Sequence, residues 1–315
     1  MVRLTGGAAS GEIVLNLLQR TLNITRLAVT PPRATSNRHG LAIVAIIKNE
    51  ARYLAEWAQF HRKAGARHFY IYDNGSTDNS CATLRAALPP DSLTIMPWAQ
   101  KFRFGTLNAE LHNQVLAYAH AVTNFGSIYR WMSWIDIDEF LVPKKGGDLN
   151  TVLRALDNQR MISLPWHMFG RSGHKTPPEG GVVANYLWRN PNPMRKSLCK
   201  FKVIADPCLV TAVKVHWMEV DGKTDSCNDQ GVLATLVART DPGFYSASQI
   251  QLNHYYTRSD ADIAEKLERG ANITTPSADN LRRVKQKIER IEAAQVEDTA
   301  ARDWLAQHKD LRNEP

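Results

Sequence analysis

The chain has 315 residues, of which 43% are hydrophobic, and a formal net charge of +8 at neutral pH. A chain of this length can bury a substantial core, either as one large α/β domain or as one domain with appendages. The positive charge suits an anionic partner such as a nucleotide diphosphate or an acidic lipid headgroup. Nucleic acid is not expected as a partner, because the basic residues are spread along the chain rather than gathered in dense tracts.

Targeting signals are weak in this sequence. No apolar run reaches the roughly 18 residues of a membrane-spanning helix, and the first ten residues lack the apolar core of a signal peptide. The four cysteines form no C-x-x-C pair, which argues against a zinc ribbon or a redox motif and is typical of reduced thiols. These features predict a cytoplasmic protein, with peripheral contact to a membrane left open.

In chain order, the first predicted elements are an amphipathic helix over residues 12–29 and a proline-containing linker over 30–40. The folded domain should begin near Leu41. Residues 41–47 are a continuous apolar run, typical of a strand buried on both faces. A helix and a second strand follow, which gives a βαβ unit; their signals are the helical spacing of Tyr53, Leu54, Trp57, Phe60 and His61 and the apolar run 68–72.

Polar residues follow both strands of this unit. Asn49 and Glu50 come after the first strand, and Asp73 and Asp78 come after the second. Loops at these strand ends suit the ribose hydroxyls and the base of a nucleotide, since carboxylates accept hydrogen bonds from a diol. Turn and N-cap chemistry explains Asp73 and Asp78 equally well, because Asn-Gly and Ser-Thr-Asp are ordinary turn formers.

The centre of the chain carries an acidic motif inside the apolar run 131–143. Side chains alternate along a strand, so Asp136 and Asp138 would share one face. If the strand ends near Glu139, both aspartates lie at its carboxyl end, where open α/β sheets bind ligands. Such carboxylates need a cation, and Mg²⁺ or Mn²⁺ bridging to substrate phosphates fits them. The alternative is that these acids cap a turn or pair with the lysines at 144 and 145.

The rest of the chain continues the alternation of strands and helices. Two predicted strands carry histidines, His216 and His254, and a neutral imidazole readily joins carboxylates on a divalent ion. A helix that begins near Ser259 carries Lys266. The further predicted strands are 93–98, 161–166, 200–204, 210–217 and 250–256, and the further predicted helices are 106–122, 149–156 and 278–294.

Five stretches in this order resemble the GT-A fold glycosyltransferases, most closely the family 92 transferases and their bacterial relatives. The stretches are Ile47 to Glu50 with Glu56, Trp57 and His61; Asp73 to Asp78; Asp136 to Phe140; Trp166 to Gly170; and His254 to Ser259 with Lys266 and Gly270. The resemblance implies a mixed, mostly parallel α/β sheet with helices on both faces. It implies a GT-A domain over 41–270, an N-terminal helix and linker over 1–40, and a C-terminal helical extension over 271–315.

The resemblance also implies a function, the transfer of a sugar from a nucleotide diphosphate donor to a saccharide or glycoconjugate acceptor. Mn²⁺ or Mg²⁺ would be the cofactor and a UDP-sugar is the expected donor. The implied roles are metal binding by Asp138, with His254 as first and His216 as second choice for a third ligand; metal or ribose binding by Asp136; nucleoside binding by Asn49, Glu50 and Asp73; and diphosphate binding by Lys266 or Arg258.

Family 92 enzymes invert the anomeric centre, which requires a carboxylate base for the acceptor hydroxyl. The sequence does not single out that base: Glu219 and Asp221 are the candidates, and Asp225 is no worse. Two other readings stay open, a metal-dependent phosphoesterase or nucleotide hydrolase and a nucleotide- or carbohydrate-binding protein without turnover. Residues 1–40 and the last helices could serve as a lid, a membrane contact or a contact within a homo-oligomer.

Overall fold

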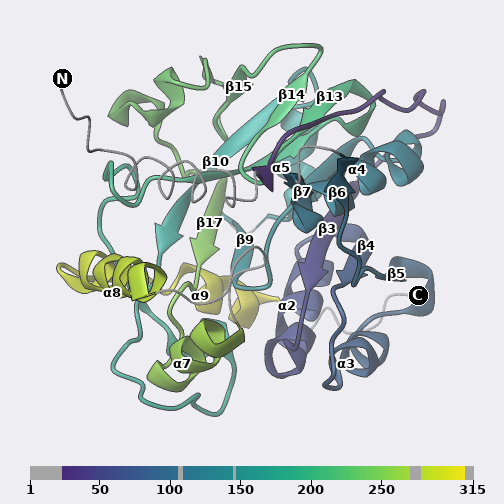
Figure 1. The fold of residues 1–315 in the computed structure, drawn as a ribbon. Coiled ribbons are helices and arrows are strands. Elements are labelled where there is room, and N and C mark those ends of the chain that lie inside the picture. The colour runs from purple at the N-terminus through teal and green to yellow at the C-terminus, as the bar shows by residue number, and fades with distance from the viewer. Residues whose placement is uncertain (1–22, 106–108, 145–146, 270–277, 309–315) are drawn as a thin grey trace, which may run out of the picture.

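The computed structural model describes residues 23–105, 109–144, 147–269 and 278–308 (Figure 1). Its helices pack on both faces of a ten-stranded sheet whose main path runs β16-β15-β10-β12-β8-β3-β4-β5. Two further strands of this sheet, β17 and β9, continue from β10. The sheet strands are β3 (Leu41–Ile47), β4 (Ala66–Asp73), β5 (Leu93–Pro97), β8 (Trp131–Trp134), β9 (Glu139–Pro143), β10 (Met161–Met168), β12 (Phe201–Ala205), β15 (Ser226–Cys227), β16 (Leu233–Ala234) and β17 (Ile250–His254).

Parallel pairing predominates slightly in this sheet. The parallel pairs are β8-β3, β3-β4, β4-β5, β10-β15 and β10-β17, and the antiparallel pairs are β10-β12, β12-β8, β15-β16 and β17-β9. The described helices are α2 (Ala51–Lys63), α3 (Ser80–Ala87), α4 (Asn113–Phe125), α5 (Leu149–Ala155), α6 (Val182–Asn185), α7 (Asp260–Arg269), α8 (Ala278–Glu292) and α9 (Ala300–Gln307). The predicted α/β class, with a mixed, mostly parallel sheet and helices on both faces, is confirmed.

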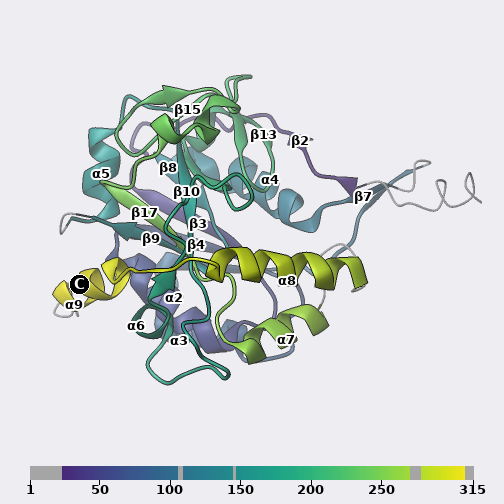
Figure 2. The same ribbon diagram turned by 90° about the vertical axis from the view of Figure 1, so that its left-hand side faces the viewer.

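Alternation along β3 explains how one apolar strand builds two cores. Leu41 and Ile43 join a buried cluster with the α2 residues, whereas Ala42 and Val44 join a second cluster with the α4 residues. Figure 2 shows α2 and α3 on one side of these strands and α4 on the other. The predicted βαβ unit is therefore present, and it fixes the loops after β3 and β4 at one edge of the sheet.

The acidic motif lies on a turn and not on a strand, which corrects the sequence-based prediction. Strand β8 ends at Trp134, and residues 135–138 turn the chain into β9. The turn is closed in both directions: the Glu139 backbone N–H donates to the Asp136 carbonyl over 3.0 Å, and the Asp136 N–H donates to Glu139 Oε2 over 2.8 Å. Strand alternation therefore does not govern the two aspartates.

Several smaller predictions also need correction. Helix α4 begins at Asn113, because Ala109–Leu111 forms strand β7, so the predicted helix start was wrong. His216 lies in the connection between β13 (Val210–Val213) and β14 (Met218–Val220), not on a strand. The remaining short strands are β1 (Asn23–Ile24), β2 (Leu27–Ala28), β6 (Arg103–Phe104), β11 (Trp188–Arg189) and β18 (Val296–Glu297).

The two ends of the described chain both contact the main body. The helix predicted over 12–29 lies mostly outside the described residues, but its described end is β-structure: β1 pairs with β7, and β2 pairs with β13. At the other end, Ile291 and Trp304 are buried in the same cluster as the core of α2. The division of the chain at residues 40 and 270 stays a prediction.

The sequence predicts no membrane-spanning helix and reduced cysteines, and the structure bears on both points. None of the described helices is both long and apolar enough to cross a bilayer. The four cysteines, Cys81, Cys199, Cys208 and Cys227, carry free thiols, and only Cys227 is buried.

Candidate active site

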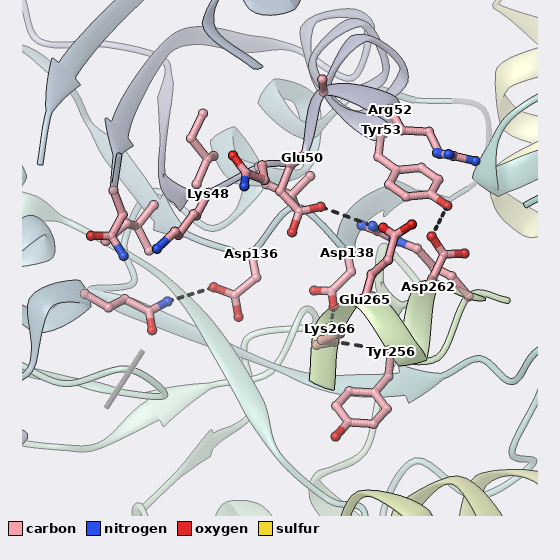
Figure 3. Close-up of a pocket in the computed structure, with 18 of the residues that line it drawn as sticks. Lys48, Glu50, Arg52, Tyr53, Asp136, Asp138, Tyr256, Asp262, Glu265 and Lys266 are labelled. Atoms are coloured by element: carbon pink, nitrogen blue, oxygen red, sulfur yellow. Dashed lines mark hydrogen bonds and ion pairs between the residues drawn. The ribbon is translucent and has the colours of Figure 1, made fainter. Parts of the chain in front are cut away.

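A cavity of about 1300 Å³ opens where the loops after β3 and β4, the acidic turn and the end of β17 meet (Figure 3). Helix α7 and Lys287 of α8 complete its wall. The volume exceeds that of a typical small-molecule site and leaves room for a nucleotide and a sugar together. Eight residues singled out from the sequence line this cavity and are brought together: Asn49, Glu50, Asp78, Asp136, Asp138, His254, Arg258 and Lys266.

Asp138 is held between two basic side chains. Its Oδ2 accepts a hydrogen bond from Lys266 Nζ over 3.0 Å, and its Oδ1 lies 3.4 Å from His254 Nε2 (Figure 3 shows the lysine contact). The carboxylate is only 14% exposed, whereas the lysine side chain is 46% exposed. The lysine can therefore move into the cavity more freely than the aspartate.

The surroundings of the two side chains favour an ionised Asp138 and a neutral His254. Burial alone would raise the pKa of Asp138, but Lys266 and His254 outweigh it and hold that pKa well below its usual range. Burial lowers the pKa of His254 although Asp138 opposes this. A carboxylate beside a neutral imidazole is a donor pair that suits a divalent cation.

Asp136 has different neighbours from Asp138. Gln114 Nε2 of α4 donates to Asp136 Oδ1 over 2.7 Å, and Lys202 Nζ of β12 lies 3.1 Å from Asp136 Oδ2. The lysine also lies 3.6 Å from Glu139 Oε2. Both oxygens of Asp136 thus have protein partners, which positions this side chain at the cavity wall.

Lys202 is a buried cation, with only 1% of its side chain exposed. Burial alone would lower its pKa, but Asp136 and Glu139 hold the pKa well above the usual value. Burial in turn raises the pKa of Glu139 well above its usual value. Lys202 and Asp136 therefore form a charged pair, and the carboxyl group of Glu139 beside them favours its neutral form.

The loop after β3 is pinned from several directions. Asn49 has a left-handed backbone, with φ of 53°, and its Oδ1 accepts a hydrogen bond from the Thr77 N–H over 2.7 Å. Glu50 Oε2 accepts from Arg258 Nη1 over 3.2 Å, and the guanidinium lies 3.8 Å from the centre of the Tyr53 ring. These contacts tie the loops after β3, β4 and β17 together around the cavity.

Four residues singled out from the sequence do not line the cavity. Asp73 accepts from the Ser76 N–H over 2.9 Å, which is the turn chemistry left open as its alternative. His216 packs its ring 5.3 Å from that of Trp166. Glu219 pairs with Arg26 over 2.8 Å and Asp221 pairs with Arg160 over 2.6 Å, on the outside of the molecule.

Other cavity residues carried no signal that sequence reasoning used. They include Gln114, Asp262, Glu265 and Lys287, and Lys202 lies just behind them. A buried lysine on a strand, as at position 202, and a lysine within the apolar stripe of a helix, as at 287, are signals that the sequence does contain. Glu265 has no hydrogen-bond or ion-pair partner among the described residues.

The donor set can be tested against a divalent metal. Within the described ranges, no three His, Cys, Asp or Glu side chains converge as a complete ligand set. Asp138 and His254 supply two donors that face each other across 3.4 Å at the cavity wall. Mg²⁺ and Mn²⁺ sites that hold substrate phosphates need only one or two protein carboxylates, so the residues present fit such an ion.

Comparison with known proteins decides the family. The model of a family described as glycosyltransferase family 92 matches residues 44–294, well over half of the chain. The chain belongs to glycosyltransferase family 92. The matched range includes the end of β3, the acidic turn, α7 and α8, so every residue that lines the cavity lies within the family 92 region.

The relatives in family 92 are plant proteins. A family 92 protein of Ricinus communis is 27% identical over 203 residues, which is 62% of this chain and 34% of the relative. One of Oryza sativa subsp. japonica is 28% identical over 182 residues, covering 56% of this chain and 29% of the relative. The chain thus spans about a third of the length of the curated relatives it matches.

Solved structures give weaker matches. A crystal structure of a mycobacterial protein aligns with a TM-score of 0.32 and 13% identity over 71% of this chain and 69% of that one. Glucosyl-3-phosphoglycerate synthase from Mycobacterium tuberculosis, solved with Mn²⁺, UDP and glucosyl-3-phosphoglycerate, aligns with a TM-score of 0.28 and 14% identity over 66% and 64%. Both scores are low, and the membership in family 92 rests on the sequence match.

Proposed function

We propose that this family 92 chain transfers a sugar from a nucleotide diphosphate donor to a saccharide or glycoconjugate acceptor, with a divalent cation as cofactor. The observation that carries the proposal is the convergence of Asp138, His254 and Lys266 in a cavity large enough for a nucleotide sugar. A UDP-sugar is the donor that the family resemblance favours.

Asp138 and His254 would hold Mn²⁺ or Mg²⁺ through a carboxylate oxygen and a ring nitrogen. When bound, such an ion supplies Lewis-acid stabilisation of the charge that develops on the departing diphosphate. His216 is less suited to this role, because it packs against Trp166 and does not line the cavity. Its partial burial lowers its pKa to about 3, so the ring is neutral.

Among the cations that line the cavity, Lys266 is the best placed to bind the diphosphate and to neutralise it as it departs. In this structure it pairs with Asp138, and its exposed side chain can turn from that carboxylate to a phosphate in the cavity. Arg258 is a weaker candidate for contact with the phosphates, because it is buried and bonded to Glu50. Its part is to hold Glu50 and, through it, the loop after β3.

Asn49 and Glu50 form the wall where the nucleoside would lie, because they follow β3 at the edge where open α/β sheets bind ligands. Asp73 supports this wall by holding the loop after β4 through Ser76. Asp136 would orient the ribose or the ion from a side chain that Gln114 and Lys202 already fix.

The base that accepts the proton of the acceptor hydroxyl is a carboxylate in an inverting transfer. Glu219 and Asp221 are engaged by arginines and do not line the cavity. Glu265 lines it and has no partner within the described residues, so we propose Glu265 for this role. The proton would pass from the acceptor oxygen to the Glu265 carboxylate as the new glycosidic bond forms.

The test is turnover with a panel of UDP-sugars in Mn²⁺, measured as release of UDP with and without mixed saccharide acceptors. We expect Glu265→Gln to lower turnover about a hundredfold or more while UDP binding is kept, because general base catalysis typically contributes about that much. Glu219→Gln is the matched control and should keep wild-type turnover. Equal loss in both variants, or none in Glu265→Gln, would return the base to the other candidates.

A further inference from the structure

One lysine of helix α8, Lys287, lies on the face of the helix that packs against the protein. Val284, Ile288 and Ile291 recur at helical spacing on one face, and Ile288 and Ile291 are 9% and 0% exposed. Lys287 lies four residues before Ile291 and therefore belongs to this inward face. Its side chain lines the cavity, so the apolar stripe of the helix is interrupted by a cation at the position that reaches the site.

The helix that carries this lysine is firmly anchored. The Glu292 carboxylate pairs with the Arg171 guanidinium, and Arg171 Nε donates to Glu292 Oε1 over 2.8 Å. Asn190 Nδ2 also donates to the carbonyl of Arg290, over 3.1 Å. The residues that make these contacts lie three and five positions after Lys287, so they hold this part of the helix, and with it the backbone of Lys287, against the main body. Figure 1 and Figure 2 both show α8 beside α7, which carries Lys266.

The ammonium group of Lys287 lies next to two aromatic rings. Its Nζ lies 3.7 Å from the centre of the Tyr256 ring and 5.2 Å from that of Trp166. Among the described residues, no carboxylate forms a hydrogen bond or an ion pair with it. Burial and the nearby Lys266 lower its pKa to about 8, although Asp138 acts in the opposite direction. The ammonium group is therefore short of negative charge in the protein without ligand.

We propose that Lys287 binds an oxyanion of the ligand, with Tyr256 and Trp166 holding the ammonium group in place from behind. This inference rests on the proposed sugar transfer. Two parts of the substrates carry such a group: the diphosphate of the donor, and a carboxylate or phosphate on an acidic acceptor saccharide. In both cases the ligand supplies a negative charge beside Lys287.

The experiment measures equilibrium binding by calorimetry to the wild type, Lys287→Met, Lys287→Arg and the control Lys285→Met. Lys285 is exposed on the same helix, so its loss removes a charge without reaching the cavity. The probes are inorganic pyrophosphate, UDP and uridine in Mn²⁺, and glucuronate against glucose. We expect Lys287→Met to weaken the anionic probe about tenfold or more, while uridine and glucose are unaffected, Lys287→Arg keeps most of the affinity and Lys285→Met keeps all of it.

Weaker binding of pyrophosphate and UDP assigns the lysine to the donor diphosphate, and weaker binding of glucuronate assigns it to an acidic acceptor. The proposal is overturned if Lys287→Met binds every anionic probe as the wild type does, if Lys285→Met loses as much, or if the wild type binds none of these anions. Failure of UDP and uridine to bind the wild type, with pyrophosphate or glucuronate still dependent on Lys287, would instead count against the nucleotide donor.

Discussion

Asp136 and Asp138 are the same residue type and are separated by a single residue, yet their side chains have different partners. Asp136 is bonded by Gln114 and by the buried Lys202, whereas Asp138 meets His254 and the exposed Lys266. The buried Lys202 thus neutralises Asp136, whereas the exposed Lys266 can leave Asp138 and free that carboxylate for a metal ion. This difference is why we assign the metal chiefly to Asp138.

The first prediction concerns Lys202. Lys202→Met should lower the free energy of unfolding by about 1–3 kcal/mol, because it removes the charged partner of Asp136, whose side chain is itself 35% exposed. Urea unfolding followed by fluorescence measures the change. Lys202→Met combined with Asp136→Asn should recover part of the loss, because the unpaired carboxylate is then removed as well. A single variant as stable as the wild type would show that the pair contributes nothing to the turn.

At the scale of elements, α2 fixes the strand that follows the acidic turn. Trp57 Nε1 donates to the carbonyl of Glu139 over 2.9 Å, and the Leu141 N–H donates to His61 Nε2 over 3.1 Å. His61 Nδ1 in turn lies 2.8 Å from the Trp57 carbonyl, so the ring is a neutral tautomer with both nitrogens bonded. Two residues of one helix therefore position β9 and the turn before it.

This buried imidazole predicts a pH effect. Burial lowers the pKa of His61 to about 3, whereas an unfolded histidine has a pKa of about 6.5. Between these values the unfolded chain binds the proton and the folded chain does not, so stability is present above pH 6.5 and falls as the pH drops towards 3. The slope for one proton is at most about 1.4 kcal/mol per pH unit.

Urea unfolding at pH 7 and at pH 5 tests this effect. His61→Gln keeps hydrogen-bonding groups but does not titrate, so it should lose less stability than the wild type between the two pH values. Other histidines with a lowered pKa, such as His167, add to the slope in both proteins and cancel in the comparison. Identical losses in the wild type and the variant would show that His61 does not carry the effect.

Elements could be predicted from the sequence where a local period is strong. The run 41–47 and the spacing of Tyr53, Trp57 and Phe60 gave a strand and a helix that the structure contains. The acidic run misled the strand prediction, because its apolar residues stay buried in the turn as they would in a strand: Ile135 is 0% and Ile137 is 4% exposed. Burial alone does not distinguish the two conformations.

At the scale of the molecule, the cavity joins segments more than 200 residues apart in sequence, from the loop after β3 to α8. The order of motifs identified the family and eight cavity residues. It could not identify the partners, because pairs such as Lys202 with Asp136, Arg26 with Glu219 and Arg160 with Asp221 depend on long-range packing. For the same reason Glu265 and Lys287 were not singled out.

In the proposed site, Asp138 and His254 hold the divalent cation that binds the nucleotide diphosphate. Calorimetry of UDP binding with and without Mn²⁺ tests it most directly, with Asp138→Asn as the variant and Asp221→Asn as an exposed acidic control outside the cavity lining. We predict Mn²⁺-dependent binding in the wild type and in Asp221→Asn, and loss of the Mn²⁺ effect in Asp138→Asn. UDP affinity that is unchanged by Mn²⁺ in the wild type, or still raised by Mn²⁺ in Asp138→Asn, would show that Asp138 does not hold a cation for the diphosphate.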